Sequence, residues 1–376
     1  MFRRIKPIIK KEFRQVSRDT GTLGILVFLP MFLLIMFGYA LNFDVKHISL
    51  AVYDEDRSKT SRDFIREFFQ SEYFDQKYYL KDKSRINELL DEGQVTGVLV
   101  VPCDFSKKVL AGQDAQVQIL VDGSNSNAAA TVIGYASGIV QAYTSKILID
   151  LLLVKTGRTF SLPIDFRPRV WYNPELKSAQ FLVPGLIAFI LMISGVISTA
   201  LSVVREKERG TMEQIIVSPI KPLELIIGKA IAYIVISLVS AYLILLMGWL
   251  VFDVPVKGSQ VQLFLVTLLF LFVALGMGLF ISTISDSQQV AFQISALLTI
   301  LPTFLLSGFV FPIRNMPYPI QIVTYIIPAR YFLVALRAIM LKGVGIAVFW
   351  QQILFMIAFA ALMVGLSWAR MRKKRL

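Results

Sequence analysis

Six apolar runs, each long enough to cross a lipid bilayer, constrain this chain more than any other feature of its sequence. A bilayer core about 30 Å thick needs roughly 20 apolar residues in a helix. The runs that we expect to span are 22–41, 181–204, 223–252, 261–284, 289–311 and 346–368. Hydrophobic residues make up 55% of the chain, an excess that a soluble domain does not need. The sequence therefore predicts an α-helical integral membrane protein with six transmembrane helices, the last five within residues 180–376.

The placement of the basic residues predicts the orientation of the chain. The net charge is +13, yet residues 42–179 hold 17 basic and 18 acidic residues, whereas the rest holds 22 basic and 8 acidic. The excess lies in short segments beside the apolar runs, as is typical of cytosolic flanks. We therefore expect both termini and the segment 205–222 in the cytosol, contact with membrane lipid, and no nucleic-acid partner.

Residues 1–21 are predicted to form a cytosolic amphipathic helix that lies on the membrane surface. Apolar residues recur there at helical spacing between basic ones. They are Phe2, Ile5, Ile9, Phe13 and Val16. The alternative is a plain basic flank that only sets the topology.

Residues 42–179, between the first and second spans, are predicted to form an extracytoplasmic α/β domain. The expected strands are rich in β-branched residues and cover 48–53, 96–101 and 117–121. The expected helices cover 60–70, 84–92, 104–111 and, as one long and largely apolar helix, 127–154. Alternating strands and helices favour a small sheet covered by helices.

The sequence offers no catalytic, cofactor-binding or metal site. It lacks a phosphate-binding loop of the Gly-x-x-x-x-Gly-Lys-Ser/Thr type, so ATP must be handled by another polypeptide. The single histidine, His47, is expected to make a local hydrogen bond, and the single cysteine, Cys103, to be a free buried thiol. The acidic cluster 54–56 adjoins basic residues, which favours a solvated turn over a metal site.

The charged segment 205–222 lies between two expected spans and is predicted to contain a short amphipathic helix. Met212, Ile215 and Ile216 share one face of this helix, which Pro219 ends. The segment is either an ordinary loop whose charges fix the topology or a docking helix for a soluble partner.

The same segment resembles the coupling-helix region of type 2 ABC transporter permeases. The resemblance rests on Arg205-Glu206-x-Glu208-Arg209-Gly210-Thr211-Met212-Glu213-Gln214, then on Ser218-Pro219 and Glu224-x-x-x-Gly228-Lys229. In that family the short helix sits in a cleft of a separate ATPase subunit. The resemblance therefore implies an ATPase-docking site formed by Arg205, Glu206, Glu208, Arg209, Gly210, Thr211, Met212, Glu213, Gln214, Ile215 and Ile216.

Other parts of the chain resemble the same family. Residues 1–21 resemble its elbow helix, and residues 38–47 together with Asp54-x-Asp56 resemble the start of its extracytoplasmic domain. The matches to its C-terminal signature are Pro312, Asn315, Pro317, Pro328, Arg330, Tyr331 and Arg337. Because a proline and two arginines interrupt the apolar stretch there, we expect short outer-leaflet half-helices over 312–343 and not a full span.

The resemblance implies the permease subunit of an ATP-driven ABC exporter in the bacterial cytoplasmic membrane. Two ATPase subunits, which carry ATP-Mg, would drive two permease copies, identical or closely related, through the coupling helix. The nearly uncharged spans favour an apolar or amphipathic substrate, such as a drug or a lipid. Whether a periplasmic adaptor protein joins the outer domain stays open. The alternatives are a non-transporting scaffold or receptor whose outer domain binds an envelope partner, and a membrane-embedded enzyme.

Overall fold

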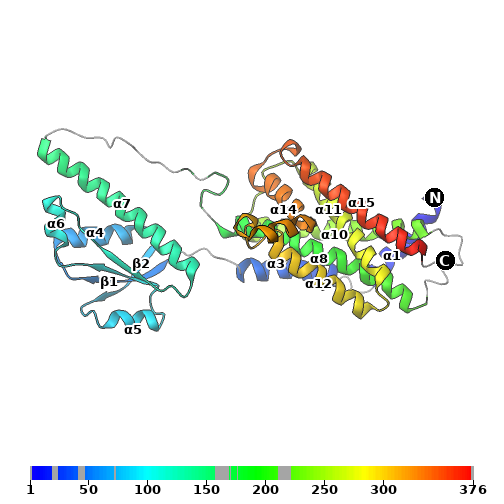
Figure 1. The fold of residues 1–376 in the computed structure, drawn as a ribbon, viewed down its shortest axis with the longest axis horizontal. Helices are drawn as coiled ribbons and strands as arrows, with labels where there is room; N and C mark the ends of the chain where they lie inside the picture. The colour runs from blue at the N-terminus through cyan, green and yellow to red at the C-terminus, as the bar shows by residue number, and fades with distance from the viewer. Residues whose placement is uncertain are drawn as a thin grey trace. The chain divides into compact units, whose positions relative to one another are not determined.

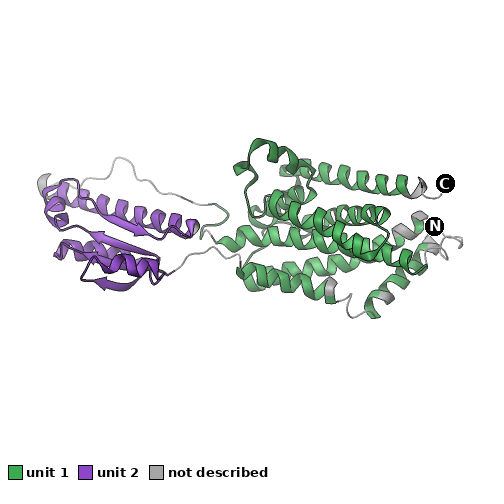
Figure 2. Ribbon diagram, turned by 60° about the horizontal axis from the view of Figure 1, so that its bottom comes forward, with its two compact units in different colours: residues 1–42, 170–376 green, residues 43–169 purple. Residues whose placement is uncertain are grey.

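The computed structural model describes residues 2–18, 24–40, 47–71, 73–156, 169, 171–175, 177–210 and 222–373. The chain divides into two compact units (Figures 1 and 2). One unit comprises Met1–Asn42 together with Val170–Leu376, and the other is Phe43–Arg169. The second unit therefore ends before the expected domain boundary at residue 179.

The unit Phe43–Arg169 is built on a four-stranded sheet. Its strands are β1 (Ile48–Asp54), β2 (Phe74–Leu80), β3 (Gly97–Val101) and β4 (Gln118–Val121), in the order β2-β1-β3-β4. β1 runs parallel to β2 and β3, whereas β4 pairs antiparallel to β3. The central strands are buried on both faces, which explains their nearly continuous apolar sequences. The edge strand β2 was not predicted, because several of its polar side chains remain in solvent.

Helices cover both faces of this sheet (Figure 1). They are α4 (Lys59–Gln70), α5 (Arg85–Asp91), α6 (Phe105–Ala111) and α7 (Ser126–Thr156). On one face, Phe64 of α4, Phe105 of α6 and Val132 of α7 share a core with β1 and β3. On the other face, Ile86 and Leu89 of α5 pack against the same two strands.

The larger unit is a bundle of long helices. Before the second unit the chain forms α1 (Phe2–Arg18), the π-helical turn η1 (Gly24–Phe28) and α3 (Leu29–Ala40). The long helices after it are α8 (Ser178–Glu208), α10 (Pro222–Phe252), α11 (Gln260–Ile284), α12 (Gln288–Leu306) and α15 (Trp350–Lys373). α8 lies at the centre, since most of its side chains between Leu182 and Val204 are buried. It packs against α3, α10, α11 and α12. Because close-packed interiors transmit strain, a displacement of α8 would also displace these four helices.

Five of the six expected spans coincide with long apolar helices, namely α8, α10, α11, α12 and α15. Over the first expected span the described helical residues are fewer: α3 has 12 residues and η1 has 5. Among the described residues, the sixth helix long and apolar enough to cross a membrane is instead α7, over Ala128–Leu153. That assignment rests on length and composition, whereas α7 packs on the sheet through Val132 and Ala136.

The stretch between α12 and α15 is a series of short helical pieces. They are η2 (Ile313–Asn315), α13 (Tyr318–Val323), η3 (Thr324–Ile326), α14 (Pro328–Arg337), η4 (Ala338–Lys342) and η5 (Ile346–Val348). Tyr318–Ile326 and Pro328–Lys342 meet at an angle of 89°. The break falls at Pro328, as expected, because proline lacks the N–H that a continuous helix needs.

Candidate functional site

The predicted docking segment connects α8 to α10, and the structure describes both of its ends. Thr211, Met212, Glu213, Gln214, Ile215 and Ile216 lie outside the described residues, so their docking role stays a prediction. Arg205–Gly210 are described, and α8 ends at Glu208. Gly210 has a φ of +67°, the left-handed conformation that commonly ends a helix and that glycine adopts freely.

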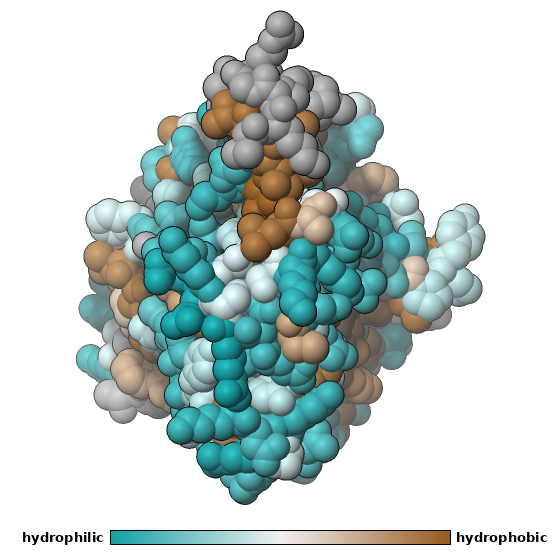
Figure 3. All heavy atoms as spheres, turned by 90° about the vertical axis from the view of Figure 1, so that its left-hand side faces the viewer, coloured by the Kyte–Doolittle hydropathy of each residue, from teal (hydrophilic) through white to brown (hydrophobic). Residues whose placement is uncertain are grey.

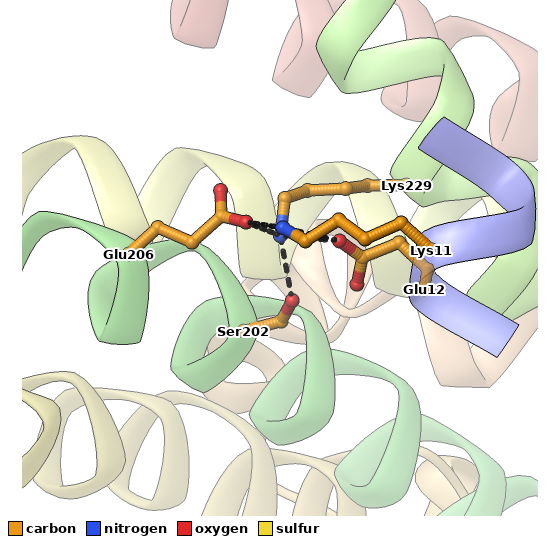
Figure 4. Close-up of polar contacts among 5 residues, drawn as sticks. All are labelled: Lys11, Glu12, Ser202, Glu206 and Lys229. Atoms are coloured by element: carbon orange, nitrogen blue, oxygen red, sulfur yellow. Dashed lines mark hydrogen bonds and ion pairs between the residues drawn. The ribbon is translucent and has the colours of Figure 1, made fainter. Parts of the chain in front are cut away.

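A cluster of charged side chains joins α8, α10 and α1 (Figure 4). The Nζ of Lys229 on α10 lies 3.1 Å from Oε1 of Glu206 on α8 and 3.2 Å from Oε1 of Glu12 on α1. It also donates a hydrogen bond of 3.1 Å to Oγ of Ser202. The Nζ of Lys11 donates to the same oxygen of Glu206 at 2.6 Å and lies 3.5 Å from Glu12. We call these five residues the ion cluster.

Most of the ion cluster is hidden from solvent. The exposed fractions are 0% for Glu12, 5% for Lys229 and 6% for Glu206. A buried charge strongly destabilises a protein unless opposite charges pair with it, and here two lysines face two glutamates. The side chain of Lys11 is half exposed. Burial works to lower the pKa of Lys11, but the hydrogen bond to Glu206 and the two carboxylate charges outweigh it and raise that pKa.

The packing of α1 on α10 places Glu12 within the cluster. Among the residues of α1 whose burial the structure describes, Ile5, Ile8, Glu12 and Val16 are buried, and their spacing of three or four residues places them on one face. A Cβ on Gly228 of α10 would lie 2.7 Å from Cγ2 of Ile8, which only glycine permits. Part of the apolar face expected on the membrane surface is therefore turned toward α10. The sequence reasoning missed Lys11 and Glu12, although Glu12 interrupts the apolar repeat.

The last turn of α8 is also fixed to the turn between α11 and α12. Glu208 accepts a hydrogen bond of 2.7 Å from the backbone N of Gln288 and another from its side-chain amide. Arg205 donates to Oε1 of Gln288 at 3.3 Å. Lys207 donates to the backbone oxygen of Ser285 at 3.3 Å and to that of Ser282. The Glu208 carboxylate lies at the N-terminus of α12, where the helix dipole favours an anion.

Three residues of the predicted docking set thus make contacts inside this chain. Glu206 is buried in the ion cluster, while Arg205 and Glu208 bind Gln288. Arg209 and Gly210 are exposed beyond the end of α8. These contacts fix the position from which the remainder of the segment starts.

The C-terminal signature residues shape the short helices. Arg337 donates to the backbone oxygens of Gly308 at 3.1 Å and Phe181 at 3.0 Å, and its guanidinium stacks 4.0 Å from the ring centre of Phe181. It thereby ties the end of α14 to the ends of α12 and α8. Pro312 and Pro317 precede η2 and α13, and the backbone N of Asn315 donates to the oxygen of Pro312 at 3.0 Å.

Arg330 and Tyr331 hold the break at Pro328. The Arg330 guanidinium lies 4.0 Å from the ring centre of Tyr325 and donates to Oγ1 of Thr324. The hydroxyl of Tyr331 donates to the backbone oxygen of Tyr325 at 2.7 Å. Both residues of α14 therefore bind η3 across the bend.

Three expectations for the unit Phe43–Arg169 have different outcomes. His47 makes the expected local interaction, with its Nδ1 3.1 Å from Oδ2 of Asp75. Cys103 was expected to be buried and is exposed, because it lies in the loop between β3 and α6. Asp54 was expected in a solvated turn, but it is 1% exposed. It accepts hydrogen bonds from the Ser61 and Tyr79 hydroxyls, both of 2.9 Å, which explains how its burial is tolerated.

Comparison with known proteins agrees with this architecture. Residues 21–369 match the family described as ABC-2 family transporter protein. The chain is 36% identical to the probable multidrug ABC transporter permease YbhS of Escherichia coli K12, over 99% of this chain and 98% of that protein. It is 32% identical to the probable multidrug ABC transporter permease YbhR of the same organism, over the full length of both. It is 24% identical to ABC transporter G family member 20 of Dictyostelium discoideum, over 96% of this chain but 48% of that protein.

The family is described as a transporter protein, and both full-length relatives are named as ABC transporter permeases, which are membrane components and not themselves enzymes. The chain therefore belongs to the ABC-2 transporter family and is the permease component of an ABC transporter.

Proposed function

We propose that this permease is driven by separate ATPase subunits that dock on the segment 205–222, and that it exports an apolar or amphipathic substrate. One observation carries the proposal. The segment starts from the last turn of α8, which the ion cluster and Gln288 hold on both sides, and it ends at α10, which carries Lys229. A force on the segment therefore reaches α1, α8, α10 and α12 through short polar contacts.

Two permease copies and two ATPase subunits, which bind ATP-Mg, form the proposed assembly. The permease sequence has no phosphate-binding loop of its own. Large apolar side chains such as Phe292, Leu297 and Leu301 of α12 are exposed on the isolated chain. A second permease copy or lipid would cover them.

A drug-like or lipid-like substrate agrees with the polar groups buried along the bundle. Among the buried side chains of the middle of α11 and α12, the polar ones are hydroxyls, including those of Thr267, Ser295 and Thr299. A bundle interior whose buried polar groups are hydroxyls suits uncharged substrate portions better than ions. The word multidrug in the names of the two similar Escherichia coli permeases supports the same class.

The proposed orientation places Phe43–Arg169 outside the cytoplasmic membrane and both termini in the cytosol. The charge distribution supports it, because the basic excess lies outside residues 42–179. The surface of this unit that Figure 3 shows is largely hydrophilic, which suits an aqueous compartment.

The test replaces Ile215 with Asp and measures both co-purification of the ATPase and ATP-driven transport. Burying an isoleucine side chain contributes about 1.5–3 kcal/mol, and a carboxylate in its place adds a desolvation penalty. We expect loss of ATPase association with normal membrane insertion. Glu213→Gln is the matched control, and its smaller effect should fade as salt rises. Full association and transport by Ile215→Asp would refute docking on this segment and favour an ordinary loop whose charges only fix the topology.

A further inference from the structure

Strand β4 is an open edge of the sheet in the unit Phe43–Arg169. It pairs with β3 on one side, and within the described part of the chain no strand pairs with its other side. None of the residues of β4 is buried, whereas every residue of β3 is. Such an edge presents backbone N–H and C=O groups that can pair with a strand of another chain.

The pairing with β3 shows which backbone groups of β4 point outward. The backbone N of Asp122 donates to the oxygen of Thr96 at 3.0 Å, so the backbone of Asp122 faces the β3 side. In an antiparallel pair the backbone groups of alternate residues point to opposite sides of the strand. Those of Val121, Ile119 and the preceding Val117 therefore point away from β3.

The two edges of this sheet differ in their protection against pairing. At the β2 edge, Asp75 and Lys77 carry charges, and the register with β1 shifts so that Lys77 has no partner between Gln76 and Tyr78. Charges and bulges of this kind keep an edge from pairing with other chains. Residues 115–121 carry no charge, and β4 pairs with β3 without a shift.

We propose that β4 pairs antiparallel with β4 of a second permease copy, with a twofold axis at Ile119. In this register Ile119 faces Ile119 of the second copy, and Val117 faces Val121. All three side chains pack on the same core, so they lie on one face of the sheet and apolar side chains meet across the junction. The strand is thus complementary to itself, as a twofold interface between identical chains requires.

The second copy is the occupant that fits this short edge best. The outward groups of three residues give only about six hydrogen bonds across the axis, which is a weak contact between free molecules. Two copies held in one transporter meet at a high effective concentration, so a short strand pair forms there. The inference therefore rests on the two permease copies of the proposed function.

The experiment forms disulfides between full-length permeases in membranes that also contain the ATPase. Cys103→Ser removes the single native cysteine, and Ile119→Cys is oxidised with copper phenanthroline. Facing Ile119 positions would have Cα atoms about 5.5 Å apart, within the roughly 4.4–6.8 Å that a disulfide spans. Gln118→Cys is the matched control, because the two Gln118 positions would lie on a diagonal, about 7–8 Å apart. Although Gln118 is the more exposed, we expect about tenfold more cross-linked dimer from Ile119→Cys.

A second pair of variants tests the register itself. In the proposed pairing Gln118 faces Leu120 of the second copy, in the close type of pair whose Cα atoms lie about 4.5 Å apart. Two differently tagged copies, one with Gln118→Cys and one with Leu120→Cys, should therefore cross-link to each other. Neither variant should cross-link when it is expressed alone.

The outcomes distinguish this inference from the proposed two-copy assembly. If Gln118→Cys cross-links as well as Ile119→Cys does, the contact is collisional and the pairing is overturned. If Ile119→Cys gives no dimer, the pairing is also overturned. Rapid reaction of its thiol with a maleimide would then mean a free edge, and slow reaction an edge covered by another segment. Two tagged copies that do not co-purify would overturn the two-copy assembly together with this inference.

Discussion

Gly278 lies where α11 crosses α8, and replacing it with alanine should weaken the bundle. A Cβ at this position would lie 2.5 Å from the backbone oxygen of Val196 and 2.8 Å from Cβ of Thr199. Carbon and oxygen atoms normally approach to about 3.3 Å, so the two helices would have to part by roughly 0.8 Å. The clash is with backbone, which no side-chain rotation relieves.

The expected loss can be worked out from two opposing effects. Overpacking a core typically destabilises by about 1–3 kcal/mol, and a backbone clash belongs to the upper half of this range. Alanine in place of glycine within a helix contributes about 0.5–1 kcal/mol of stability. The net destabilisation of Gly278→Ala should therefore be about 1–2.5 kcal/mol. In a domain of comparable size this lowers the unfolding midpoint by a few degrees.

The assay follows thermal unfolding of the purified permease in detergent by tryptophan fluorescence. Gly365→Ala on α15 is the matched control, because a Cβ at Gly365 meets no atom within 4 Å. That variant should melt at or slightly above the wild-type midpoint. If Gly278→Ala melts as high as Gly365→Ala, then α8 and α11 do not pack as closely as the structure shows, and the reasoning is refuted.

Two further predictions concern the unit Phe43–Arg169. Cys103 is the single cysteine and is exposed, so a membrane-impermeant maleimide should label it from outside intact spheroplasts; labelling only after lysis would contradict the proposed orientation. Burial of Tyr79, with its hydrogen bond to Asp54, raises the pKa of this tyrosine from 10.0 to about 12. Because the folded-state pKa is the higher one, this contribution to stability is complete below pH 10.0 and is lost as the pH rises toward 12. Between pH 10 and 12 the free energy of unfolding, followed by circular dichroism, should therefore fall less in Tyr79→Phe, which has no hydroxyl to titrate, than in Tyr143→Phe, and equal slopes would argue against the Asp54 contact.

The long helices were predictable because bilayer thickness sets their length directly. α8, α10, α11, α12 and α15 each coincide with an expected span, and their ends differ from the expected ones by a few residues. Strand β2, which was not predicted, shows the limit of reasoning from local sequence. Its polar side chains are exposed because it is an edge strand, and nothing local shows that β1 lies beside it. Its identity as a strand depends on that long-range pairing.

The charged residues at the end of α8 were recognisable, but their partners were not. Glu206 meets Lys11, which is 195 residues away in the chain, and Glu208 meets Gln288, which is 80 residues away. A local pattern of alternating charges predicts that every charged side chain in it is exposed. The pattern therefore assigns all the charged residues at the end of α8 to the docking site, without distinguishing among them. Only the packing of α1 on α10 and of α12 on α8 separates the residues that bind within the chain from those that remain exposed.

Glu12 shows how one residue can decide between two interpretations of the same helix. A basic amphipathic helix that lies on lipid and a helix that packs on a neighbour share one apolar periodicity, so Ile5, Ile8 and Val16 fit either. A carboxylate on that face fits only the second, because acyl chains offer it no cation, whereas Lys229 lies 3.2 Å away. An acidic residue on the apolar face of a basic helix therefore predicts a buried cation on the element that covers it. Here that element is α10, which leads directly from the segment 205–222, so Glu12 connects α1 to the proposed coupling region.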